Sequence, residues 1–145
     1  MLTQPQAQDL LETYRRALER LDVDLAVSLY SEDADLRDNP FEPSCAGLLQ
    51  IRALWNNLAA TRTNVEMDIE RSWVVGNTIL ASWHGAHTVR HTAERLRQRG
   101  FMILDLDPNG LITRERRWVI ERAVGLDATW APEPEGEMIL GDITR

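Results

Sequence analysis

In the first sixty positions of the chain, apolar residues recur every three or four places, which is the period of an amphipathic helix. This pattern predicts one helix over residues 6–21 and a second that Asp22 or Asp24 caps and that ends near residues 31–33. A third helix is predicted after Gly47, and a short extended piece precedes the loop that leads to it. The predicted buried faces include Tyr14, Tyr30 and Trp55.

From residue 64 onward, apolar and polar residues alternate, which is the period of a strand with one buried face. The alternation and the turn residues at positions 76–77 and 107–110 predict an antiparallel sheet. Its strands cover residues 64–74, 78–90, 97–106 and 111–121. Helices followed by a long sheet indicate an α+β fold, in which a curved, mostly antiparallel sheet packs three N-terminal helices in its concave face and leaves one cavity.

The overall charge narrows the range of partners. The 145 residues suffice for one domain with a buried core, and they carry a formal net charge of -7. An acidic chain lacks the basic patch that nucleic acid or an anionic membrane surface requires, so we expect neither as a partner. No apolar run approaches the roughly 18 residues of a membrane span, and no signal-like segment is recognisable. We therefore expect a cytoplasmic protein that binds a small apolar molecule.

Two residue counts limit the chemistry. All 16 basic residues are arginine, so no lysine amine is available for Schiff-base catalysis. Cys45 is the single cysteine, which rules out an intrachain disulfide and a cysteine metal cluster within one chain. We predict no cofactor.

The last stretch of the chain follows neither period. After Gly125 it contains Pro132, Pro134 and several acids, which indicates a loop or an arm. Its apolar residues suit a covered surface, and they are Trp130, Met138, Ile139 and Leu140. We expect one domain over residues 1–124 and an arm over residues 125–145 that covers the mouth of the pocket or lies on a partner subunit.

An acid on stiff backbone is the first candidate for chemistry. Asp38 stands at the edge of an apolar segment, and Pro40 and Pro43 hold the residues before them out of helical geometry. Phe41 could give the carboxylate the dry surroundings that suit a general base. Because Asp, Asn and Pro are also the commonest turn residues, the alternative is that Asp38 opens a turn.

The order of elements and several residues carry a resemblance to a known family. These residues are Tyr14, residues 31–38, the proline that follows them, and Gly47 ahead of Ile51 and Arg52. Together these features resemble the nuclear transport factor 2-like (NTF2-like) superfamily. Within it the resemblance is closest to the ketosteroid isomerase and SnoaL-like polyketide cyclase branch, over about residues 6–122. It implies a cone-shaped α+β barrel whose pocket takes a small cyclic or polyketide-like molecule.

The same resemblance implies roles for individual residues. In the isomerases an acid at the end of the first short strand is the general base, and a helix-borne tyrosine donates to the developing oxyanion. Asp38 and Tyr14 occupy these positions, although Asn39 separates the acid from its proline. A second donor of the isomerases, a protonated aspartic acid, is replaced by Met102, whose thioether cannot donate. Since one lost donor costs about 10² to 10³ in rate, steroid isomerisation itself is disfavoured.

Strand alternation suggests a replacement for the missing donor. If Leu80 faces the cavity, Ser82 and His84 face it too, and His84 points towards Asp38. A histidine titrates near neutrality and can donate or accept a proton, so Asp38 and His84 form a candidate acid/base pair. The alternative is a core histidine bonded to a backbone carbonyl.

On the last strand, the same alternation places Glu115 and Arg117 inside, where they would give the cavity a polar floor. A slip of one residue would reverse every side chain and bury Trp118 instead.

The spacing of the three histidines requires a separate test for a metal site. On a helix, His84, His87 and His91 would share one face and could bind zinc. On a strand, the first two lie on opposite faces, and the last two are about 13 Å apart. We therefore predict no metal.

Two classes of function stay open. In the first, the protein is a cofactor-independent isomerase or cyclase that acts by proton abstraction, or carries out dehydratase or epoxide-hydrolase chemistry in the same pocket. In the second, it is a non-catalytic ligand-binding or dimerisation module. The candidate catalytic residues are Asp38, Tyr14 and His84, and the candidate substrate-binding residues are Phe41, Trp55, Ser82, Met102, Glu115 and Arg117.

Apolar side chains on the outer sheet face also predict association. Such a surface is larger than a monomer usually exposes, which favours a homodimer through the sheet. The outward residues expected there are Trp83, Phe101, Ile103 and Trp118.

Overall fold

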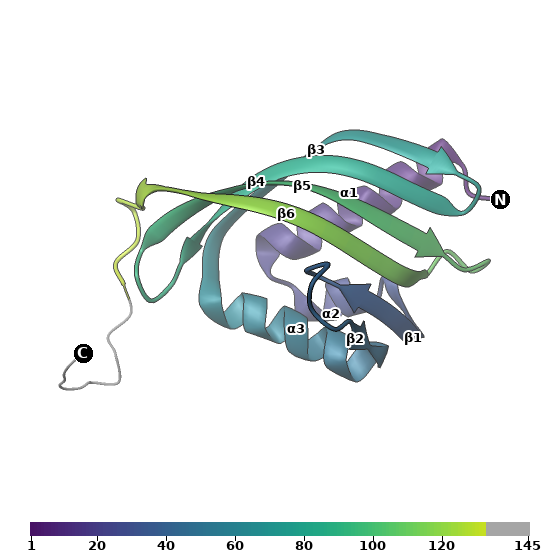
Figure 1. The fold of residues 1–145 in the computed structure, drawn as a ribbon, viewed down its shortest axis with the longest axis horizontal. Coiled ribbons are helices and arrows are strands. Elements are labelled where there is room, and N and C mark those ends of the chain that lie inside the picture. Colours follow the sequence, from purple (N-terminus) through teal and green to yellow (C-terminus); the bar gives the residue numbers. More distant parts are fainter. Residues whose placement is uncertain (133–145) are drawn as a thin grey trace.

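The computed structural model describes residues 1–132 of the chain, and Figure 1 shows how its elements are arranged. The first half contains α1 (Gln4–Arg20), α2 (Val23–Val27), β1 (Tyr30–Arg37), β2 (Cys45–Ala46) and α3 (Gly47–Thr61). The second half contains β3 (Arg62–Val75), β4 (Thr78–Val89), β5 (Glu94–Leu106) and β6 (Ile112–Leu126). Within this described part, no helix is both long and apolar enough to cross a membrane.

One mixed sheet contains the six described strands, in the order β2-β1-β6-β5-β4-β3. Strands β1 and β6 pair in parallel, and the other neighbouring pairs are antiparallel. The sheet is strongly curved, and the three helices lie on its concave side (Figure 1). This arrangement confirms the predicted α+β fold.

Helix α1 forms as its sequence predicts. The amide of Gln6 donates to the Thr3 hydroxyl at 3.2 Å, and the Thr3 amide donates to the Gln6 side chain at 2.9 Å, which is a capping box. Leu21 adopts the left-handed conformation that ends the helix. The apolar stripe faces the sheet and buries Tyr14, as expected.

Tyr30 belongs to a strand and not to the second helix, so the predicted length of that helix is wrong. Asp22 caps α2 by accepting from the amide of Leu25 at 3.1 Å, but the helix ends after 5 residues. The amide of Ile112 donates to the carbonyl of Leu29 at 2.8 Å, and Tyr30 pairs with Ile112 in the sheet. A helix this short gains little from its own hydrogen bonds, so pairing with β6 decides the local conformation.

The two faces of β4 are the reverse of those predicted. The residues on its concave side are Ile79, Ala81, Trp83 and His87, and those on its outer side include Leu80, Ser82 and His84. Both faces carry apolar residues, so alternation alone does not decide which one is buried. Packing of the large Trp83 ring decides it.

Gly100 makes room for that ring. Trp83 and Gly100 are paired across β4 and β5, and a Cβ atom added at Gly100 would lie 2.5 Å from Cε2 and Cζ2 of the indole. The indole therefore lies directly over the backbone of β5, where only glycine leaves enough space.

Strands β5 and β6 are longer than predicted. Their extra pairs join Glu94 to Leu126 and Leu96 to Ala123, where the sequence has no clear alternation. The two predicted turns are confirmed: residues 76–77 connect β3 to β4, and residues 107–110 connect β5 to β6.

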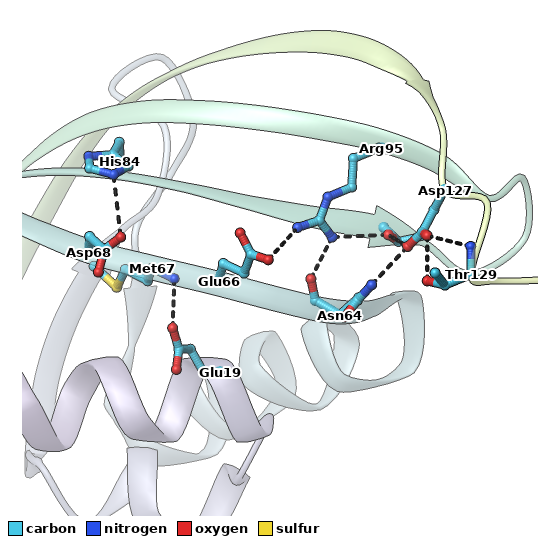
Figure 2. A network of polar contacts seen from close by, with 10 residues as sticks. Glu19, Asn64, Glu66, Met67, Asp68, His84, Arg95, Asp127 and Thr129 are labelled. Carbon is cyan, nitrogen blue, oxygen red and sulfur yellow. Dashed lines mark hydrogen bonds and ion pairs between the residues drawn. The ribbon is translucent and has the colours of Figure 1, made fainter.

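The chain is fixed to the sheet directly after β6 (Figure 2). The Asp127 carboxylate accepts hydrogen bonds from the Thr88 hydroxyl at 2.5 Å and from the Asn64 amide group at 2.9 Å. The indole N–H of Trp130 donates to the carbonyl of Arg90 at 3.1 Å. The expected covering role of the arm rests mainly on residues 133–145, among them Met138, Ile139 and Leu140, which lie outside the described residues.

We expect Gly100→Ala to destabilise the fold by about 1–3 kcal/mol, because the added methyl group displaces the Trp83 ring. Urea denaturation followed by circular dichroism measures this loss. A double-mutant cycle with Trp83→Leu is the control, since the alanine should cost much less once the indole is absent. An equal cost in both backgrounds would show that the contact with Trp83 is not the cause.

Candidate functional site

A cavity of about 620 Å³ opens on the concave side of the sheet. Its apolar wall contains Leu18 from α1, Leu58 from α3 and Trp83 and Val119 from the sheet. Its polar residues are Asp38, Asn39, Arg62, Gln98, Arg117 and Glu121. A cavity of this size with a few converging polar groups is typical of a small-molecule site.

Behind the cavity lies a fully buried carboxylate, that of Glu115. It accepts a 2.6 Å hydrogen bond from the Tyr14 hydroxyl on one oxygen and another of 2.6 Å from the Tyr30 hydroxyl on the other. Burial and the neighbouring Glu115 raise the pKa of both tyrosines well above its ordinary value, so both remain donors at neutral pH. Three separate elements, α1, β1 and β6, meet at this carboxylate.

Arg117 connects this buried carboxylate to the cavity. Its Nη2 lies 2.9 Å from Oδ1 of Asp38, and its Nε lies 3.2 Å from Oε2 of Glu115, although that N–H does not point at an acceptor. Burial opposes the charge of Arg117, but the surrounding tyrosines and carboxylates outweigh it and raise its pKa. We call this arrangement the Asp38–Arg117–Glu115 chain.

Asp38 is the outer end of the Asp38–Arg117–Glu115 chain. It follows β1 directly, and its side chain is 48% exposed and lines the cavity. The carboxylate is thus held on one side by Arg117 and open on the other. Glu115 and Arg117 point inwards, while Trp118 is exposed, so the alternative in which Trp118 fills the core is wrong.

Tyr14 is close to the site but does not line the cavity. Its hydroxyl is committed to Glu115, and its ring packs edge-on against Trp55, with 5.9 Å between the ring centroids. Trp55 is buried behind the cavity, as is Met102, which pairs with Arg117 across β5 and β6. Trp55 and Met102 therefore support the site from behind and are not among the residues that line it.

His84 lies on the outer face of the sheet, so the expected pair with Asp38 is wrong. Its Nδ1 is 2.9 Å from Glu70 and its Nε2 is 3.4 Å from Asp68, a contact that Figure 2 shows. The alternative of a core histidine is wrong as well. Ser82 shares this outer face, because the faces of β4 are reversed.

Phe41 lines the cavity, as predicted, but its side chain is largely open to solvent. Its ring is 92% exposed, so it does not give Asp38 the dry surroundings expected from the sequence. Phe41 belongs to a turn in which the amide of Glu42 donates to the carbonyl of Asn39 at 3.0 Å and Pro40 takes the second position, and a residue in such a turn is readily exposed.

Several residues of the cavity and of its buried support are not found by the sequence analysis. Tyr30 was assigned to a helix, Trp83 to the outer face, and Arg62 and Gln98 lie at positions where the pattern gives no signal. A search for a buried acid with tyrosine partners could have found Tyr30, but only with β1 starting at the correct residue. Within residues 1–132, no three His, Cys, Asp or Glu side chains lie close enough together to hold a metal ion.

A second histidine, His87, is buried on the concave side near the cavity. Burial lowers its pKa to about 4, and the positive charges of Arg62 and Arg95 act in the same direction. His87 is therefore neutral at pH 7, when its ring can accept a hydrogen bond.

The sequence of this domain matches the family model of the SnoaL-like domain over residues 11–115. The chain belongs to the SnoaL-like family. No curated protein matches the sequence.

Solved structures similar to this SnoaL-like chain include SalBIII, the epoxide hydrolase/cyclase-like enzyme of pyran ring formation in the polyether salinomycin. Its TM-score is 0.74 at 18% identity, over 83% of this chain and 95% of that chain. A LEH-like epoxide hydrolase from Mycobacterium tuberculosis has a TM-score of 0.68 at 19% identity, over 80% of this chain and 84% of that chain.

A protein of ketosteroid isomerase-like fold from Catenulispora acidiphila, in complex with trimethylamine, has a TM-score of 0.69 at 15% identity, over 85% of this chain and 97% of that chain. At such identities the likeness shows the fold alone, which is that of the NTF2-like superfamily.

The buried His87 predicts how the stability of this SnoaL-like domain depends on pH. Between pH 6.5, the ordinary pKa of histidine, and about pH 4, His87 is protonated in the unfolded state but neutral in the folded state. The free energy of unfolding therefore falls as the pH falls through this window. The loss should approach about 3 kcal/mol. Urea denaturation at pH 7 and pH 4 should therefore show a smaller loss for His87→Gln than for wild type.

The exposed His91 provides the matched control, and His91→Gln should lose as much stability as wild type. An unchanged loss in His87→Gln would show that other groups carry the pH dependence.

Proposed function

We propose that this protein is a cofactor-independent isomerase or cyclase in which Asp38 abstracts a proton from a small cyclic or polyketide-like substrate. One observation carries the proposal. The Asp38 carboxylate lines the cavity while Arg117 holds it from behind at 2.9 Å. A general base must be fixed in direction and still reach the substrate, and this geometry meets both requirements.

The support behind Asp38 favours catalysis over a turn-forming role. Arg117 is oriented by Glu115, and Glu115 is oriented by Tyr14 and Tyr30 from two different elements. Residues locked in this way keep a reacting group within a narrow range of positions. We assign the two tyrosines as positioning residues, since their hydroxyls are committed to Glu115.

The negative charge that develops on the substrate also needs a donor. Tyr14 is occupied by Glu115, Met102 cannot donate, and His84 lies on the other face of the sheet. We therefore assign this role to a guanidinium of the cavity, and Arg117 is the nearest to the base.

We expect Asp38→Asn to lower kcat by about 10² to 10⁴ and to change KM much less, because asparagine keeps the shape but cannot take a proton. The assay follows exchange of acidic C–H protons with deuterated solvent across a panel of cyclic ketones. Tyr14→Phe is the companion variant, and it should lose less activity because it only loosens Glu115. Equal exchange by wild type and Asp38→Asn would exclude Asp38 as the base.

Epoxide opening is the second candidate, and the Asp38–Arg117–Glu115 chain is the observation that favours it. A carboxylate held by arginine can activate a water molecule as well as it can abstract a C–H proton. The solved neighbours SalBIII and the LEH-like protein carry epoxide hydrolase in their names. Incorporation of ¹⁸O from labelled water into diol products would identify this reaction. Ligand binding with neither exchange nor diol formation would leave the non-catalytic binding module.

We also propose a homodimer through the outer sheet face. Three of the four predicted side chains lie there, namely Phe101, Ile103 and Trp118, and Trp73 joins them with its ring 6.3 Å from that of Phe101. Trp83 does not belong to this group, because it is buried on the concave side. An apolar band on an otherwise polar sheet is typical of an interface.

Light scattering at micromolar concentration should give twice the 16.6 kDa mass of the chain. Phe101→Glu places a charge in the middle of the band and should yield the single-chain mass. Arg20→Glu, at the exposed end of α1 on the other side of the sheet, is the control and should leave the dimer intact. A monomer mass for the wild type would contradict the proposal.

A further inference from the structure

The cavity contains two arginines, and they have different surroundings. Arg117 is buried between the carboxylates of Asp38 and Glu115. Arg62 is half-buried at the start of β3, and its guanidinium makes no hydrogen bond or ion pair with any residue among positions 1–132. Five N–H donors are thus available on one wall of the cavity.

The fold does not compensate the charge of Arg62 in the way it compensates that of Arg117. Burial, and then the positive charge of Arg117, lower the pKa of Arg62, and the negative charges of Asp38 and Glu121 offset this only in part. A partly buried cation without a partner costs free energy, which an anionic ligand can recover by pairing with it.

Other donors near the cavity also lack acceptors. The Nε1 of Trp83 and the Nε of Arg117 are buried and have no hydrogen-bond partner in the described part of the chain. The Gln98 amide, in contrast, donates to Glu121 at 2.6 Å. The two carboxylates of the cavity, those of Asp38 and Glu121, are thus already paired with Arg117 and Gln98, whereas Arg62 has no partner among the described residues. A ligand that brings its own oxygen atoms suits this arrangement.

The apolar wall of the cavity requires an apolar surface on the ligand. The Trp83 indole lies over Gly100, and Leu18, Leu58 and Val119 line the same cavity. Such a wall suits a flat hydrocarbon body, because an aromatic ring buries a large area when it stacks on an indole.

From these observations we propose that the ligand carries a carboxylate that Arg62 binds while its apolar body packs against Trp83. This inference rests on the proposed function only in taking the cavity as the substrate site. It adds a negatively charged group to the small apolar molecule that the sequence predicts as the ligand. It makes Arg62 a specificity-determining residue that is separate from the base.

Two probes of equal shape and different charge test the proposal, namely 2-naphthoate and 2-naphthamide. Isothermal titration calorimetry at pH 7 should show wild type binding the naphthoate about tenfold or more tightly than the naphthamide. Arg62→Gln should remove this preference, with a large loss of naphthoate affinity and a much smaller change in naphthamide affinity. Arg62→Lys keeps the charge without the planar fork and should retain part of the preference.

Arg122→Gln, an exposed arginine of β6, is the matched control and should keep the full preference. Circular dichroism establishes that each variant is folded. Equal affinity of wild type for the two probes, or an undiminished preference in folded Arg62→Gln, would overturn the assignment.

The same titration with Asp38→Asn separates this inference from the proposed reaction. That variant keeps Arg62 and loses a nearby negative charge, so it should bind naphthoate at least as tightly as wild type does. If Asp38→Asn loses exchange activity and keeps the preference for naphthoate, both proposals are supported. No exchange activity in the wild type, with the preference present, would reject the proposed reaction and leave the anion site standing.

Discussion

The buried carboxylate of Glu115 is the constraint on which the site depends. A charge without exposure is stable only when its hydrogen bonds are satisfied and a counter-charge is close, and here two tyrosine hydroxyls and Arg117 meet these conditions. Because the partners come from α1, β1 and β6, satisfying one carboxylate also fixes how the first helix and the first strand lie against the last strand. The orientation of Asp38 follows from that arrangement.

A second constraint, the contact of Trp83 with Gly100, shapes the cavity that Asp38 faces. The indole lies over the backbone of β5 because glycine leaves it the space, and it forms part of the apolar wall. Strands β5 and β6 carry polar residues of the cavity, and β4 and β6 carry the apolar Trp83 and Val119, while α1 and α3 complete the apolar wall with Leu18 and Leu58. A curved sheet can present both to one ligand, whereas a flat sheet would spread them apart.

The sequence was sufficient for the fold class and for the inward direction of Glu115 and Arg117, because period and turn residues there agree with each other. It was insufficient for β4, where both faces carry apolar residues and only the volume of Trp83 and the absence of a side chain at Gly100 decide. The error about His84 follows directly from that choice. Tyr30 was missed for a different reason, since a one-turn helix and a paired strand compete there and a hydrogen bond from Ile112 decides.

The two cavity arginines show how one residue type can serve structure and recognition side by side. Arg117 lies between two acids, so its charge is compensated within the protein and removing it would leave Glu115 uncompensated. Arg62 is held only by the backbone at the junction of α3 and β3, and its charge contributes no described contact to the fold. A charge that the fold does not need, on the wall of a cavity whose other donors lack acceptors, is better explained by what enters the cavity than by the stability of the protein.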